Sequence, residues 1–309
     1  MIVNTIHDPI VLKRPVATIG IFDGVHTGHR FILDHLRQRA VDLDGDSVVV
    51  TLWPHPQVVL NRGLPKFKLL HTREEKLREL EKSGIDQLVI VPFDMEIASL
   101  TACEFTQQYL VNQLGIHVLL VGYDNRFGRD RKGDPKGLAR CADQNRFRIE
   151  KLPEFNSDLG RISSTLIRDA ISTGDLVRAN QMLGYEYYLA GNIVEGNHVG
   201  RELGFPTANI HPLNPYKLIP MNGVYAVRAE LKGRLYGGML NIGFRPTLDS
   251  ASAVKTVEAH LFGASGDFYG EHVVVHFVKR IRAEMRFSGK EELKRQLEKD
   301  QKLIQKMLS

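Results

Sequence analysis

Hydrophobic and polar positions follow two different periods along the first 183 residues. Short runs rich in β-branched residues predict strands at 16–22, 47–53, 87–91, 118–122 and 148–152. The stretches between them repeat apolar residues at helical spacing and predict helices at 29–41, 72–82, 102–113 and 135–144. Because strands that alternate with helices pair in parallel through right-handed crossovers, this half predicts a doubly wound α/β sheet. Ligands of such sheets bind at the carboxyl ends of the strands.

The pattern changes after Leu183, where strand follows strand and glycine becomes more frequent. Glycine supplies 13 of the first 183 residues and 14 of the last 126. Strands are predicted at 191–194, 224–230, 235–241, 256–261 and 272–278, followed by an amphipathic helix at 290–308. Strands at this interval are typical of a small antiparallel barrel. The sequence therefore predicts two domains, residues 1–183 and 184–309.

Composition places the chain among ordinary globular proteins. It has 309 residues, of which 43% are hydrophobic and 25% charged, enough for two separate cores. We expect a cytoplasmic protein, since no apolar run approaches the ~18 residues of a membrane span and no secretory signal is visible. Cys103 and Cys141 have no metal-like or redox-like spacing and fit a reducing compartment. The net charge of +5 favours anionic partners, either phosphorylated small molecules or nucleic acid.

Two histidines mark the first candidate site, in the segment IGIFDGVHTGHR at 19–30. His26 and His29 flank Gly28 where a strand ends and a helix begins, and a helix N-terminus attracts anions. Two imidazoles there can donate hydrogen bonds to phosphoryl oxygens, and Gly24 and Gly28 let the backbone approach a phosphate. The plainer alternative is that each histidine only caps and packs the turn, but the joint pattern favours the functional interpretation.

A second helix start, RISSTLIR at 161–168, offers hydroxyls and free N–H groups, and its two arginines can bind a leaving pyrophosphate. An ordinary Ser/Thr cap is the alternative. Between these segments, residues 126–148 hold eight basic and three acidic side chains. A solvated loop or a nucleic-acid patch is possible there, but aromatic and basic residues are not interleaved as RNA stacking requires. We expect a lip beside a phosphate site, with Asp124 and Asn125 near the adenosine end.

The segment His26-Thr27-Gly28-His29 resembles the H-x-G-H signature of nucleotidylyltransferases. Class I aminoacyl-tRNA synthetases carry a similar tetrapeptide, but the Ser-Ser-Thr-x-x-Arg element resembles that of adenylyltransferases. The resemblance implies transfer of an adenylyl group from ATP to a phosphate, with His26, His29 and Arg161 as catalytic residues. The nucleotide-binding residues that it implies are Gly20, Phe22, Asp23, Gly24, Gly28, Asp124, Ser163, Ser164, Thr165 and Arg168.

A second site is predicted at 204–209, which reads GFPTAN. Pro206 fixes the local backbone, so that the Thr207 hydroxyl and the Asn209 carbonyl can serve as hard oxygen ligands. Such ligands suit a Mg²⁺ ion that bridges nucleotide phosphates. The spacing of Gly191 and Gly196 is similar to that of a P-loop. The motif is nevertheless absent, because Asn197 and His198 stand where Lys and Ser/Thr are required.

This G-F-P-T-A-N stretch resembles riboflavin kinase, and the segments 223–226, 241–247, 257–260 and 267–270 agree with it in order. Over its whole length the chain resembles the bacterial bifunctional riboflavin kinase/FAD synthetase family. The resemblance implies an α/β nucleotidylyltransferase domain followed by a β-barrel kinase domain, with riboflavin, FMN and ATP as ligands and FAD as product. Glu258 would be the general base, and Thr207 and Asn209 would hold Mg²⁺–ATP under the 191–200 turn. The other kinase-site residues implied are Gly191, Gly196, Gly200, Gly204, Phe205, Pro206 and Asn241.

Two alternatives stay open at this point. One is a chain with kinase activity alone, and the other is a flavin- or RNA-binding regulator without turnover. We expect neither, because motifs for both activities are intact, and we expect no nucleic acid, membrane or obligate protein partner.

Overall fold

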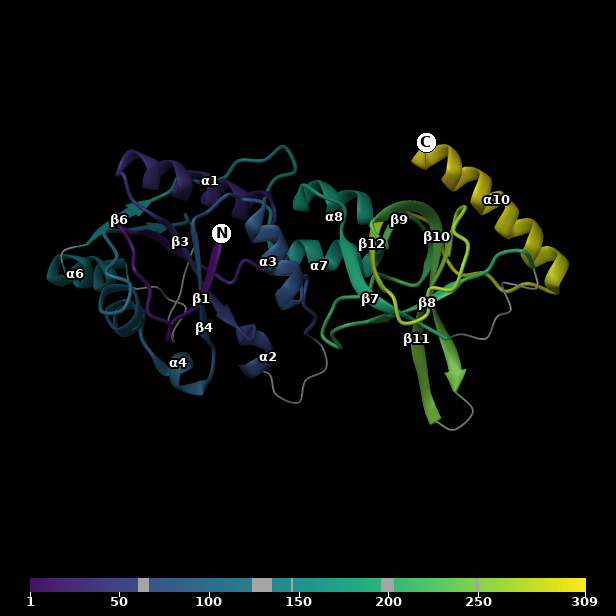
Figure 1. Ribbon diagram of the computed structural model, residues 1–309, viewed down its shortest axis with the longest axis horizontal. Coiled ribbons are helices and arrows are strands. Elements are labelled where there is room, and N and C mark those ends of the chain that lie inside the picture. The colour runs from purple at the N-terminus through teal and green to yellow at the C-terminus, as the bar shows by residue number, and fades with distance from the viewer. Residues whose placement is uncertain (61–66, 124–134, 146, 196–202, 248–249) are drawn as a thin grey trace. The chain divides into compact units, whose positions relative to one another are not determined.

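The computed structural model describes residues 1–60, 67–123, 135–145, 147–195, 203–247 and 250–309 (Figure 1). Side chains at 135–137, 245–247 and 250–254 lie outside this description. Contacts within the chain divide it into two units, Met1–Ser163 and Ser164–Ser309.

The first unit is built on a six-stranded parallel sheet with the order β1-β4-β3-β2-β5-β6. Its strands are β1 (Ile2–Thr5), β2 (Val16–Ile19), β3 (Ser47–Trp53), β4 (Gln87–Pro92), β5 (Val118–Val121) and β6 (Arg148–Lys151). Its helices are α1 (Thr27–Asp42), α2 (Pro56–Leu60), α3 (Arg73–Glu81), α4 (Met95–Ser99), α5 (Ala102–Phe105), the π-helix η1 (Thr106–Val111) and α6 (Pro135–Asn145). The predicted doubly wound sheet is confirmed, and the predicted elements end within three residues of the observed ones.

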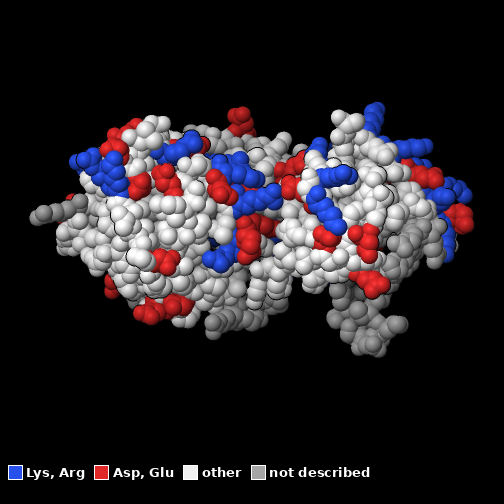
Figure 2. Space-filling model, viewed as in Figure 1, with Lys and Arg blue, Asp and Glu red and all other residues white. Residues whose placement is uncertain are grey.

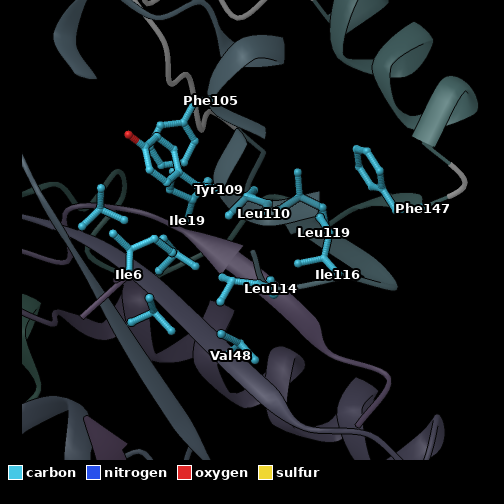
Figure 3. Packing of buried hydrophobic residues seen from close by; sticks show 14 of the residues in the cluster. Ile6, Ile19, Val48, Phe105, Tyr109, Leu110, Leu114, Ile116, Leu119 and Phe147 are labelled. Atoms are coloured by element: carbon cyan, nitrogen blue, oxygen red, sulfur yellow. The ribbon is translucent and has the colours of Figure 1, made fainter. Parts of the chain in front are cut away.

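Successive side chains along each strand point alternately into two hydrophobic cores, one on each face of the sheet. Val48 and Val50 of β3 belong to the same buried cluster as Phe105 of α5 and Tyr109 of η1. Figure 3 shows Val48 in this cluster and the neighbouring rings of Phe105 and Tyr109. Val49, between them, points the other way into a core with Leu33 and other residues of α1. This explains why the strands read as continuous apolar runs, since both faces of a doubly wound sheet are buried.

Some elements of the first unit differ from the sequence prediction. Strand β1 and helices α2 and α4 were not predicted, because each spans only four or five residues and shows too little of a period. The predicted helix at 102–113 is helical but changes type at Thr106, where the hydrogen bonds widen to five residues, as from the Asn112 N–H to the Gln107 carbonyl.

The second unit is a closed antiparallel barrel, which confirms the predicted antiparallel barrel. Its strand order is β10-β11-β8-β7-β12-β9. Its strands are β7 (Tyr188–Val194), β8 (Ala208–Pro212), β9 (Gly223–Leu231), β10 (Arg234–Thr247), β11 (Ser250–Leu261) and β12 (His272–Arg282). Helix α10 (Lys290–Leu308) has the predicted bounds and packs Ile304 against Met239 and Ala226 of the barrel. Strand β8 was not predicted, because Pro206 lies just before it and Pro212 is its last residue, and proline lacks the N–H group that pairs strands.

Two helices, α7 (Ser164–Thr173) and α8 (Leu176–Leu183), belong to the second unit. The Asn180 side chain donates to the Phe277 carbonyl of β12 at 2.8 Å, and its oxygen accepts from the Tyr187 N–H at 2.8 Å. The Ile171 carbonyl of α7 accepts from the Met221 N–H at 3.3 Å. These bonds attach both helices to the barrel. The domain boundary predicted at residue 183 stays a prediction.

The described surface carries charges of both signs. On the face shown in Figure 2, basic and acidic side chains are interspersed, in keeping with the small net charge of +5. Cys103 and Cys141 are both free thiols. None of the helices in the described ranges combines the length and the apolar character that a membrane crossing requires.

Candidate functional sites

The turn between β2 and α1 holds the first site. Strand β2 lies between β3 and β5, which is the point where the sheet order reverses and where doubly wound sheets bind ligands. The backbone of this turn is left-handed at Phe22 (φ 50°), Gly24 (φ 89°) and Val25 (φ 34°). A β-branched residue rarely adopts a positive φ, so the turn is strained at Val25. Such strain persists only where the surrounding structure enforces it, and it is common at active sites.

The structure brings the two predicted histidines into contact. Their rings stack with centroids 3.6 Å apart and planes 14° from parallel. His26 is the N-cap of α1, and its Nδ1 accepts the His29 backbone N–H at 3.3 Å. Because Nδ1 accepts, the proton of a neutral His26 ring is on Nε2, which is then a donor for an anion. At Gly28, a Cβ would lie 3.3 Å from two atoms of the His26 ring, so a side chain there would press on that imidazole.

Burial keeps the second imidazole neutral. It lowers the pKa of His29 well below the ordinary value, and the neighbouring His26, Lys76 and His71 lower that pKa further. Within the described ranges, the buried His29 Nδ1 has no hydrogen-bond partner. A neutral imidazole can still donate one hydrogen bond to a phosphoryl oxygen, so this environment is compatible with the predicted role.

Residues that the sequence analysis missed support the turn. The carboxylate of the buried Asp23 accepts the backbone N–H groups of Leu70 at 3.2 Å and of His71 at 3.0 Å. The Lys76 ammonium donates to the Ile21 carbonyl at 2.9 Å and lies over the Trp53 ring, 5.0 Å from its centroid. Burial lowers the pKa of Lys76 to about 8, against the opposing effect of the Asp23 charge. A lysine in a charged helix normally faces solvent, so the sequence carried no signal for this one.

The Ser-Ser-Thr-x-x-Arg element lies where α7 begins. Ser163 is the last residue of the first unit, and Ser164 is the first residue of the helix, so the predicted helix start is confirmed. Thr165 is exposed and Arg168 is half-buried, while Arg161 is exposed just before the helix. Their approach to the histidines stays a prediction. Asp124, Asn125 and the rest of the predicted lip at 124–134 lie outside the described residues.

In the barrel, strand register sets the second site. Glu258 of β11 pairs directly with Asn209 of β8 on one side and with Asn241 of β10 on the other. Directly paired residues of adjacent strands point to the same face of a sheet, so the carboxylate lies between two amide side chains. Three residues that were predicted separately therefore form one row.

A cavity of about 280 Å³ opens over this row. Its polar lining includes Thr207, Asn241 and Glu258, and its apolar wall comes from the barrel and from α10, including Phe205, Met239 and Leu297. A mostly apolar cavity with a few convergent polar groups is the usual form of a small-molecule site.

A histidine outside the prediction supports the G-F-P-T-A-N segment. His260 Nδ1 lies 2.8 Å from the Pro206 carbonyl, which can only accept, so Nδ1 is the donor. The His260 ring meets Phe205 edge-on at 5.3 Å, and the Phe205 side chain is buried. Gly204 has a left-handed φ of 85°, which favours glycine. Together these contacts fix the backbone that presents Thr207, which is exposed.

The C-terminal helix is attached to the cavity wall by an ion pair. Arg282 of β12 lines the cavity and forms a two-pronged pair with Asp300 of α10, with nitrogen–oxygen distances of 2.7 and 2.9 Å. Asp300 also accepts from the Gln296 side chain at 2.9 Å. The sequence analysis missed this pair, because its partners are charged residues on elements that give no sign of meeting.

The remaining predicted kinase-site glycines are only partly described. Gly191 lies within β7, where a Cβ would come within 2.6 Å of the His211 carbonyl oxygen of β8, so close strand packing requires glycine. Gly196 and Gly200 lie outside the described residues. In the first site, the predicted nucleotide-binding residue Gly20 directly follows β2, and its N–H donates to the Val50 carbonyl at 3.1 Å.

No cluster of three or more His, Cys, Asp or Glu side chains suited to a metal occurs in the described part of the chain. Mg²⁺ prefers oxygen ligands and keeps several waters, so it needs few protein groups. The Thr207 hydroxyl and the Asn209 amide oxygen are of this type, and Asn209 is paired with the Glu258 carboxylate. The donor set therefore fits a magnesium ion held mainly by nucleotide phosphates.

Taken together, the paired histidines at the switch point of a parallel sheet and the carboxylate row in a closed barrel define a two-domain enzyme, with a nucleotidyltransferase-like domain followed by a kinase barrel. The sequence model of the FAD synthetase family matches residues 9–166, and that of the riboflavin kinase family matches residues 183–308. The chain belongs to the family of bifunctional riboflavin kinase/FMN adenylyltransferases. The family and the two enzyme domains expected from the sequence are confirmed.

Relatives of this family match almost the whole chain. The bifunctional riboflavin kinase/FMN adenylyltransferase of Bacillus subtilis is 36% identical over 295 residues, covering 93% of this chain and 90% of the relative. The Haemophilus influenzae protein of the same name is 38% identical and covers 94% and 93%. A crystal structure titled macrolide-efflux protein from Streptococcus pneumoniae superposes with a TM-score of 0.89 at 30% identity over 99% of both chains. The two-domain architecture is therefore shared with an experimental structure.

Proposed function

We propose that the two domains act in succession on one flavin. The barrel transfers the γ-phosphoryl group of ATP to the 5′-hydroxyl of riboflavin, which gives FMN and ADP. The α/β domain then transfers the adenylyl group of a second ATP to the phosphate of FMN, which gives FAD and pyrophosphate. The observation that carries this proposal is the presence of two chemically distinct constellations, the stacked histidines and the Asn209–Glu258–Asn241 row, in separate units.

In the kinase step, Glu258 accepts the proton of the riboflavin 5′-hydroxyl as its oxygen attacks the γ-phosphorus, and the bond to the β–γ bridging oxygen breaks. Phosphoryl transfer needs mainly positioning and charge neutralisation, so one carboxylate with flanking amides is sufficient for this step. The apolar wall of the cavity would receive the flavin ring, while Thr207 and Asn209 would hold Mg²⁺–ATP. Magnesium, when bound, neutralises phosphate charge and orients the phosphates.

In the adenylyl step, a phosphate oxygen of FMN attacks the α-phosphorus of ATP, and the bond to pyrophosphate breaks. His26 donates from Nε2 to oxygens that gain charge in the transition state, and His29 donates beside it. The N-terminus of α1 and the glycine backbone supply further N–H donors. Arg161 and Arg168 would bind the pyrophosphate that leaves.

Chromatography of the flavin products tests this function. Purified protein is incubated with riboflavin, ATP and Mg²⁺, and separately with FMN, ATP and Mg²⁺. We expect FMN and then FAD in the first reaction and FAD in the second. A kinase-only enzyme would stop at FMN, and a flavin-binding regulator would return riboflavin unchanged. Either outcome with folded protein contradicts the proposal. The cytoplasmic location and the preference for magnesium stay predictions.

A further inference from the structure

Lys76 is a charged residue at a buried position, where its charge lowers the stability of the fold. Its side chain is 3% exposed, on the face of α3 that also buries Leu80. Across the described chain its ammonium makes no ion pair within 4.0 Å, and its contacts are the Ile21 carbonyl and the Trp53 ring. Burying a charge without a paired carboxylate lowers stability, and an apolar side chain of similar length would pack there at less cost. Packing alone therefore does not explain a lysine.

Hydrogen bonding alone does not explain it either. The Ile21 carbonyl also accepts from the Thr51 hydroxyl at 3.3 Å, so this buried acceptor has a neutral donor already. What Lys76 adds is a positive charge behind the turn. The titratable groups that interact electrostatically with it are the Asp23 carboxylate in the turn and His29 on α1.

The turn that Lys76 contacts is the one that carries the stacked histidines. Ile21 precedes the strained stretch from Phe22 to Val25, and His26 follows directly. Asp23 ties the same stretch to the backbone before α3 through its bonds to Leu70 and His71. The N-terminal end of α3 thus holds the turn at two points, one anionic and one cationic.

We propose that Lys76 is a positioning residue for adenylyl transfer, which holds the turn bearing His26 and His29 through the Ile21 carbonyl and keeps a fixed positive charge behind the two imidazoles. This inference rests on the proposed adenylyl transfer to FMN. The charge favours the neutral form of His29 and adds to the field that attracts phosphates to the N-terminus of α1. Lys76 itself touches no substrate in this account.

The test compares Lys76→Met, which keeps the length and removes the charge, with Lys76→Arg, which keeps the charge. Arg73→Met is the matched control, because Arg73 begins the same helix and is exposed. We expect Lys76→Met to lower kcat for FAD formation from FMN by ~10²-fold, the usual cost of one preorganised electrostatic group, with less than about threefold change in KM. Lys76→Arg should recover part of this loss, and Arg73→Met should match the wild type.

Two readouts separate positioning from a purely structural role. Kinase activity, measured in the same samples, should be unchanged in Lys76→Met, and its thermal transition should not fall. The wild-type kcat should decline as pH rises through about 8, where Lys76 loses its proton, and Lys76→Met should lack this decline. Carboxylates and imidazoles ordinarily titrate at lower pH, so the facing groups do not produce it.

The outcomes are distinct. If the wild type forms no FAD from FMN, the proposed function fails and the inference with it. If the wild type forms FAD but Lys76→Met has wild-type kcat, the inference alone is overturned. It is also overturned if Lys76→Gln, a second variant that removes the charge and serves if Lys76→Met does not fold, forms FAD from FMN with wild-type kcat.

Discussion

At the scale of single residues, His26 and Glu258 each belong to one of the two chemical steps. His26→Ala should lower FAD formation from FMN by ~10²–10³-fold, the usual effect of losing one transition-state donor, while FMN still accumulates from riboflavin.

Glu258→Gln should lower FMN formation by ~10²–10⁴-fold, because the amide cannot accept the proton, while FAD still forms from supplied FMN. Product chromatography measures both. Loss of both activities in either folded variant would contradict the division of labour.

The buried Lys76 also predicts a pH dependence of stability. Its pKa is lowered to about 8 in the folded protein, so between about pH 8 and 10.4 the unfolded chain binds the extra proton. The free energy of unfolding attributable to this group therefore rises with pH across that window. From pH 7 to pH 10, wild type should gain up to about 3 kcal/mol relative to Lys76→Met, at about 1.4 kcal/mol per pKa unit.

Urea unfolding followed by tryptophan fluorescence measures this difference. Trp53 is the only tryptophan of the chain and lies beneath Lys76, so its signal reports on the first unit. Tyr109 of that unit, whose pKa burial raises, has an opposite alkaline effect that is common to both proteins and cancels in the comparison. Parallel stability curves for the two proteins would show that Lys76 keeps an ordinary pKa.

At the scale of elements, α10 forms part of the kinase cavity because the Arg282–Asp300 pair attaches it to β12. Asp300→Ala leaves the guanidinium mostly buried without its carboxylate. Removing one partner of a buried pair costs about 3–5 kcal/mol, and we expect the lower end because the Arg282 side chain is 17% exposed. The KM for riboflavin should rise as well, since Leu293 and Leu297 of this helix line the cavity.

Thermal unfolding and kinase kinetics check the role of this helix, with Lys299→Ala, an exposed neighbour, as the control. If Asp300→Ala stayed within about 0.5 kcal/mol of the control and kept the wild-type KM, the attachment would have no energetic importance. Adenylylation of supplied FMN should change less than the kinase activity in either variant, because helix α10 (Lys290–Leu308) carries none of the residues predicted for adenylyl transfer.

At the scale of the whole molecule, two separate sites predict complementation between inactive chains. Neither His26→Ala nor Glu258→Gln should form FAD efficiently from riboflavin. A mixture of the two should do so, because the first variant supplies FMN and the second consumes it. The rate should rise with added FMN and with the concentration of both proteins. A mixture that makes FMN but no FAD, although Glu258→Gln accepts supplied FMN, would show that FMN stays bound to the chain that makes it.

The sequence predicted those parts of the molecule that depend on local order. The helix predicted at 72–82, the bounds of α10 and the valine-rich β3 all follow from residues a few positions apart. That His26 and His29 share one helix start was predicted for the same reason, whereas the stacking of their rings was not predicted. These features were predictable since propensity, capping and periodicity are properties of short segments.

Long-range pairing was decided only by the tertiary structure. Asn209, Glu258 and Asn241 form one row because β8, β11 and β10 adopt one register, and a slip of one residue would turn Glu258 away from the cavity. Strand β8, which follows Pro206 and ends at Pro212, forms only because β7 and β11 supply its hydrogen-bond partners. Burial of Lys76 and the pairing of Arg282 with Asp300 likewise depend on which elements pack together. By itself, the sequence determined the longer helices and strands and the order of the two fold types, since these are set by neighbours along the chain. The fold determined which of those residues meet, since that contact depends on packing between segments far apart in sequence.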